Sequence, residues 1–123
     1  MQSQDSTPLL DYAHLEPFID IGLTDFLDIL SDVIRELPCQ LEQIRTAIAQ
    51  GDHATFKTRA HSLRGMLANF GCLRLTTVLL QLEHGGMIQA ERADAIHAEL
   101  ETLWQQSLTA IKVWEKFALQ AEP

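Results

Sequence analysis

The sequence lacks several features that would assign it to a specialised class of protein. It has nine Lys and Arg residues against 17 Asp and Glu residues, so its net charge is −8 and its pI is near 4.9. A surface this acidic repels the phosphate backbone of nucleic acids, which argues against nucleic acid as a partner. None of the six glycines lies in a GxGxxG or GxxxxGK[ST] pattern. The chain therefore has no phosphate loop of a nucleotide-dependent kinase or ATPase.

Cysteines and long apolar runs are also scarce. Cys39 and Cys72 lie in apolar surroundings without CxxC spacing, which favours two buried, reduced thiols over a disulfide. No run approaches the roughly 18 apolar residues of a membrane-spanning helix. The N-terminal sequence MQSQD lacks the basic start of a signal peptide. We therefore expect a soluble, cytoplasmic protein that does not insert into a membrane.

The apolar residues recur at the three- and four-residue spacing of amphipathic helices. Pro and Gly divide the chain into five such segments, and no segment alternates with a period of two. With 123 residues and 46% apolar content, the chain fits a single domain. The sequence predicts an all-α protein, an up-and-down antiparallel four-helix bundle preceded by a short extra N-terminal helix. The domain is expected over residues 9–119, between flexible tails at 1–8 and 120–123.

The helix boundaries follow from the residues that start and stop helices. The short helix is expected over residues 9–21, and the second over residues 23–50 with a kink at Pro38 but an unbroken apolar stripe. Gly51 ends this helix and Asp52 caps the next. The remaining helices are expected over residues 52–70, 73–83 and 89–119.

The segment over residues 52–70 carries a polar cluster opposite its apolar stripe. At 100° per residue, His61 falls about 140° from the centre of the stripe, on the solvent side. Lys57, Arg64, Gly65 and Ala68 fall in the same outward sector. The sequence thus predicts an open imidazole with two cations and two very small residues around it.

Each part of this cluster has a chemical use. A neutral imidazole is a nucleophile near physiological pH. Lys57 and Arg64, four residues before and three after His61, can offset the negative charge of a phosphoryl group on the ring. Gly65 costs roughly 1 kcal/mol of helix stability relative to Ala. We interpret that cost as the consequence of keeping the approach to His61 open.

The run AHSLRGMLANFG, followed by Leu75 and by LEHGG at residues 82–86, resembles the histidine-containing phosphotransfer (HPt) family. That family's pattern is Ala-His-x-Leu-Lys-Gly, then Ala-Asn-Leu-Gly, then Leu-Glu ahead of a glycine turn. The resemblance implies that His61 accepts a phosphoryl group on Nε2, that Arg64 replaces the family's lysine, and that Gly65 gives access to the ring. Arg64 keeps the charge of lysine but changes its shape. Met66 and Leu67 stand where small residues are common in the family, so the packing beneath the site need not be the same.

The resemblance implies a phosphocarrier of a two-component phosphorelay, not an enzyme. His61 would take a phosphoryl group from an aspartyl phosphate on the receiver domain of a response regulator or hybrid sensor histidine kinase, and pass it to another aspartate. The receiver is expected to supply Mg²⁺, and this chain is expected to need no cofactor or metal. Without a nucleotide loop it should not phosphorylate itself from ATP. We expect it to be a monomer.

Two alternatives remain beside this interpretation. The first is a helical interaction module that binds a signalling partner without being phosphorylated. The second is a di-iron bundle, because Asp11–His14 and Asp94–His97 repeat an acid–His spacing of three residues. It is disfavoured because His97 falls beside its apolar stripe and the middle helices are expected to supply no buried glutamate.

The remaining histidines and the two tryptophans are expected to be structural. We place His14 at the edge of the core and assign no chemistry to His53, His84 or His97. Trp104 and Trp114 are expected in the core and at its rim.

Overall fold

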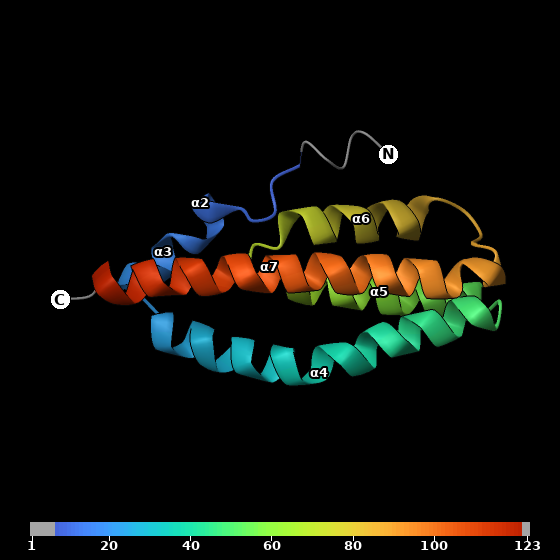
Figure 1. The fold of residues 1–123 in the computed structure, drawn as a ribbon, viewed down its shortest axis with the longest axis horizontal. Helices are drawn as coiled ribbons and strands as arrows, with labels where there is room; N and C mark the ends of the chain where they lie inside the picture. Colours follow the sequence, from blue (N-terminus) through green and yellow to red (C-terminus); the bar gives the residue numbers. More distant parts are fainter. Residues whose placement is uncertain (1–6, 122–123) are drawn as a thin grey trace.

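The computed structural model describes residues 7–121, so residues 1–6 of the predicted N-terminal tail and residues 122–123 of the predicted C-terminal tail lie outside the described residues. In chain order the elements are α2 (Tyr12–Leu15), α3 (Pro17–Asp20), α4 (Leu23–Ala49), α5 (His53–Ala68), α6 (Leu73–His84), the 3₁₀ turn η1 (Ala90–Arg92) and α7 (Ala93–Ala121). Residues 7–121 contain no strand. The four long helices run antiparallel in a bundle (Figure 1). The predicted all-α bundle with an N-terminal helical extension is confirmed.

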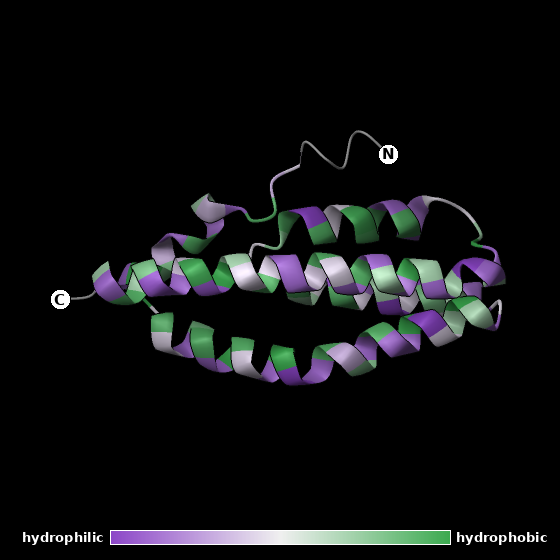
Figure 2. Ribbon diagram, in the orientation of Figure 1, coloured by the Kyte–Doolittle hydropathy of each residue, from purple (hydrophilic) through white to green (hydrophobic). Residues whose placement is uncertain are grey.

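The order of the helices around the bundle determines which faces lie far apart. α5 packs between α4 and α6, and α7 packs between the same two helices on the other side. α5 and α7 therefore lie diagonally across the bundle, and their backbones do not approach each other closely. Figure 2 shows that α4 turns apolar residues toward its neighbours and polar residues outward. None of the described helices combines the length and apolar character needed to cross a membrane.

α4 continues through Pro38, as the sequence predicts. Proline has no N–H and its ring crowds the preceding turn, so the helix bows outward in its middle (Figure 1). The apolar stripe stays in phase on both sides, since Leu37 and Leu41 are both buried. Packing of this stripe against α5 and α7 offsets the missing backbone hydrogen bond.

The N-terminal region differs from the single helix predicted over residues 9–21. The helical conformation begins only after Asp11, whose carboxylate accepts a hydrogen bond from the His14 backbone N–H at 3.3 Å. Pro17 then divides it into α2 and α3, because its nitrogen cannot continue the hydrogen-bond ladder. Ile21, the last residue of the predicted helix, is 80% exposed. Gly22, with a φ of 85°, turns the chain into α4.

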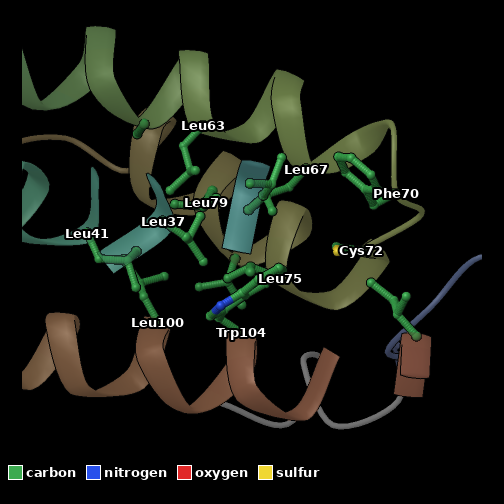
Figure 3. Close-up of a cluster of buried hydrophobic side chains, with 14 of the residues drawn as sticks. Leu37, Leu41, Leu63, Leu67, Phe70, Cys72, Leu75, Leu79, Leu100 and Trp104 are labelled. Atoms are coloured by element: carbon green, nitrogen blue, oxygen red, sulfur yellow. The ribbon is translucent and has the colours of Figure 1, made fainter. Parts of the chain in front are cut away.

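The core is filled by side chains from all four long helices (Figure 3). Trp104 is buried between them, and Trp114 is buried nearer to the end of the bundle. The core includes Leu37, Leu41, Leu63, Leu67, Leu75, Leu79 and Leu100. Burial of these leucines on every helix fixes the rotation of each helix, and therefore fixes which residues face solvent.

The cysteines match the prediction only in part. Both are free thiols. Cys72 is buried, and burial raises the pKa of its thiol to about 12. Cys39 is exposed, so the prediction of two buried thiols is wrong. Cys39 lies two residues, or about 200°, from the buried Leu37 on α4 and so falls on the outer side of that helix.

Candidate functional site

α5 begins where two local signals place it. Gly51, with a φ of 69°, reverses the chain after α4. The Asp52 carboxylate accepts a hydrogen bond from the Thr55 backbone N–H at 3.1 Å and caps the helix. Phe56 and Leu63 are then buried against the core. With the helix fixed in this way, the His61 side chain points outward and is 68% exposed.

The other residues predicted beside His61 fall into two groups. Lys57, Gly65 and Ala68 are exposed on α5, and a Cβ added at Gly65 would meet no atom within 4 Å. Arg64 differs from them, because its side chain is only 26% exposed and turns toward α6. Within the described residues no hydrogen bond joins Lys57 to the imidazole. The structure therefore brings Arg64, and not Lys57, against the ring.

A buried glutamate on α6 completes the site. Glu83 is only 7% exposed. Its Oε1 accepts a hydrogen bond from Arg64 Nε at 3.1 Å, and its Oε2 lies 3.1 Å from His61 Nδ1. The sequence predicts no buried glutamate in the middle helices, and that prediction is wrong. The available signal is the LEHGG stretch at residues 82–86, in which Glu83 precedes the glycine turn.

The environment of Glu83 keeps its carboxyl group ionised. Burial by itself raises the pKa of a carboxyl group, because it disfavours the charged form. The hydrogen bonds from Arg64 and His61, with the charge of the guanidinium, outweigh burial and hold the pKa of Glu83 below its ordinary value. A negative charge is therefore held against one edge of the imidazole at neutral pH.

This charge decides which nitrogen of His61 carries the proton. Nδ1 has two neighbours, Glu83 Oε2 at 3.1 Å and a terminal nitrogen of Arg64 at 3.0 Å. Nδ1 can donate to the carboxylate or accept from the guanidinium, but not both. We assign the proton to Nδ1, because a buried carboxylate requires donors and Arg64 already bonds its other oxygen. Nε2 then keeps its lone pair on the outer edge of the ring.

The pKa of Glu83 leads to a prediction about stability. A carboxyl group whose pKa is lower in the folded chain stabilises the fold above its unfolded pKa of about 4.3, and loses that contribution as the pH falls through its folded pKa. Glu83→Gln should therefore be less stable than the parent by about 1 kcal/mol at pH 7, with a difference that shrinks below about pH 4. Thermal melts of both proteins across this pH range measure it. A difference that is constant with pH would contradict the ionised pairing.

Three of the four residues in the Asp11–His14 and Asp94–His97 pairs have contacts that stabilise the fold. His14 is exposed rather than at the edge of the core, and its Nε2 lies 3.0 Å from the Asn69 carbonyl oxygen. Asp11 caps α2, and Asp94 forms an ion pair with Arg45 at 3.0 Å. Over residues 7–121, no group of three or more His, Cys, Asp and Glu side chains is arranged to hold a metal ion. The His53 ring stacks on Phe56.

Comparison with protein families gives one match. The family model of the Hpt domain matches residues 28–112, which span most of α4, all of α5 and α6, and the first two-thirds of α7. This range includes His61, Arg64 and Glu83. No curated protein and no solved structure matches the chain.

Proposed function

Because the chain belongs to the Hpt domain family, we propose that His61 carries a phosphoryl group between two receiver domains. Members of this family carry phosphoryl groups in two-component signalling. His61 accepts the group from an aspartyl phosphate on one receiver domain and passes it to an aspartate on another. The observation that carries this proposal is the His61 ring itself. It is exposed, it lies against Glu83 at Nδ1, and its Nε2 makes no hydrogen bond within the described residues.

The chemistry uses the two sides of the ring differently. Nε2 attacks the phosphorus of the aspartyl phosphate. The N–P bond forms as the bond between phosphorus and the carboxylate oxygen breaks. The receiver's aspartate then leaves as a free carboxylate. The ring gains positive charge in this step while Nδ1 keeps its proton. The Glu83 carboxylate, 3.1 Å from Nδ1, stabilises that charge. The reverse steps deliver the phosphoryl group to the next aspartate, with Mg²⁺ expected on the receiver.

The charge distribution around His61 supports an acidic partner. α5 contains Lys57, Arg59 and Arg64 and no acidic residue, although the chain as a whole carries a net charge of −8. A surface groove of about 990 Å³ between α4 and α5 extends from Ser62, the neighbour of His61, and is lined by Arg35, Glu36 and Arg59, with Arg35 paired to Asp32. The cations of α5 beside the histidine, rather than the groove as a whole, complement the acidic phosphorylation pocket expected of a receiver domain.

Arg64 provides the first kinetic test of this proposal. Arg64→Ala should slow transfer by on the order of tenfold, about 1.4 kcal/mol, because it removes a cation beside the phosphoryl site and leaves Glu83 without its Oε1 donor. Arg64→Lys should recover most of the rate, since it restores the family's residue and the charge. Transfer rates from a phosphorylated receiver, measured with thermal melts of the same preparations, check both variants. Equal defects in both would show that Arg64 acts through its guanidinium geometry rather than its charge.

A further inference from the structure

An apolar groove lies between the C-terminal part of α7 and the N-terminal helices α2 and α3. Tyr12, Val113 and Phe117 line it and are 53%, 51% and 67% exposed. The half-buried Ile19 and the buried Trp114 complete its lining, and its volume is about 480 Å³. We call it the α7 groove. In Figure 1 α2 and α3 lie against the C-terminal end of α7, and residues of α3 contact α7. A gathering of large exposed apolar side chains marks an interaction surface.

The two flanks of the α7 groove carry opposite charge. On the side of the N-terminal helices, Glu16 lines the groove and the exposed Asp20 follows one turn later. On α7, the exposed Lys112 and Lys116 each lie two residues, or about 200° around the helix, from Trp114. Because Trp114 faces the core, these lysines lie on the outward face of α7, beyond Val113 and Phe117 from the N-terminal helices that carry the acids. Lys112 makes only a long surface contact with Glu115, at 3.9 Å.

We propose that the α7 groove is the interface of a weak symmetric dimer, and that its occupant is a second copy of this chain. A two-fold axis along the groove brings the acidic flank of each copy against the lysines of the other, and lets the two Phe117 side chains fill the apolar centre. A foreign segment of a single charge sign would complement one flank and be repelled by the other. The pattern of acid, apolar strip and base is complementary to itself.

This dimer goes beyond the proposed phosphocarrier function and differs from the monomer expected from the sequence. It leaves the phosphotransfer face free, because α5 lies diagonally across the bundle from α7. The five apolar side chains that line the groove, two of them already buried or half-buried, offer less than the roughly 800 Å² per partner of a standard stable interface. We therefore expect a dissociation constant of roughly tens of micromolar.

Sedimentation equilibrium from about 1 μM to 1 mM chain spans this range of dissociation constants. The parent should shift from monomer to dimer, and Phe117→Asp should weaken the dimer at least tenfold, because it places a charge in the apolar centre. Phe117 is exposed, so this variant should keep its fold. The matched control is Met87→Asp, at an exposed residue near the opposite end of the bundle, which should dimerise like the parent. A parent that stays monomeric throughout overturns the proposal, as does a control that is equally weakened.

Charge reversal tests the symmetry. One variant carries Lys112→Glu and Lys116→Glu, and the other carries Glu16→Lys and Asp20→Lys. Each alone should remain monomeric, because like charges then face each other across the interface. Mixed at equal concentration, the two should form a heterodimer of near-parental affinity, because both flanks are complementary again. If the mixture stays monomeric, the flanks do not meet and the proposal fails. Both variants should still accept phosphate on His61, so failure of the dimer is distinct from failure of the phosphocarrier function.

Discussion

Replacing His61 with Gln should abolish phosphoryl transfer while leaving the bundle folded. The side chain is 68% exposed and contributes its nucleophilic nitrogen, whereas the core beneath it is formed by Phe56 and Leu63. A glutamine amide can still donate a hydrogen bond to Glu83, so the loss of stability should not exceed about 1 kcal/mol. Incubated with a phosphorylated receiver and Mg²⁺, the parent should gain one acid-labile, alkali-stable phosphoryl group and the variant none.

The matched controls are the exposed or half-buried histidines elsewhere on the surface. His53→Gln and His84→Gln should label like the parent, because neither ring is held by a buried carboxylate in the described structure. Incubation of the parent with ATP alone should give no label.

Binding of the receiver should survive in His61→Gln, which separates phosphotransfer from a pure interaction module. Label that persists in His61→Gln would contradict the assignment of the site.

The second large effect is expected at Gly65, where Gly65→Gln should lose at least about tenfold in transfer rate, or more than 1.4 kcal/mol, without loss of stability. Gly65 lies one turn after His61 on the same exposed face, and a Cβ there meets no atom within 4 Å. The free bundle should therefore accept the larger side chain and gain up to about 1 kcal/mol of helix stability. The added atoms stand where a receiver must approach Nε2. Thermal melts and transfer rates of the same preparations measure both quantities.

Gly65→Ala is the matched control for the size of the obstruction. It brings a similar gain in helix propensity with a single added carbon, so it should be more stable than the parent and keep most of the transfer rate. If Gly65→Gln transfers at the parental rate, the steric account of Gly65 is wrong. If it unfolds, the position is not open in solution.

The helices could be predicted where apolar periodicity was long and continuous. The stripe through Pro38 predicted one bowed helix, because packing on both sides of the proline determines the outcome. The prediction was wrong near Pro17, where α2 and α3 are each only four residues long and local hydrogen bonding decides. The spacing of the apolar residues over residues 9–21 does not reveal that the backbone hydrogen-bond ladder of the helix is interrupted at Pro17.

Within the candidate site, the sequence could predict only the positions of residues that lie on the same helix, α5. His61 and Gly65 were placed outward by the phase of α5, and the structure has both exposed. Glu83 was missed because its contact with His61 joins residues 22 apart, on two helices whose facing sides are set by tertiary packing. Helical phase places Arg64 at the margin of the outward sector. Only its contact with Glu83 shows that its side chain turns toward α6.

Nitrogen-15 NMR of the phosphorylated protein, with the imidazole nitrogens labelled, tests the central claim most directly. It identifies both the histidine that carries the phosphoryl group and the nitrogen to which phosphorus is bonded. Phosphorus is expected on Nε2 of His61, with Nδ1 still protonated beside Glu83. Phosphorus on Nδ1 of His61, or on any other histidine, would contradict it.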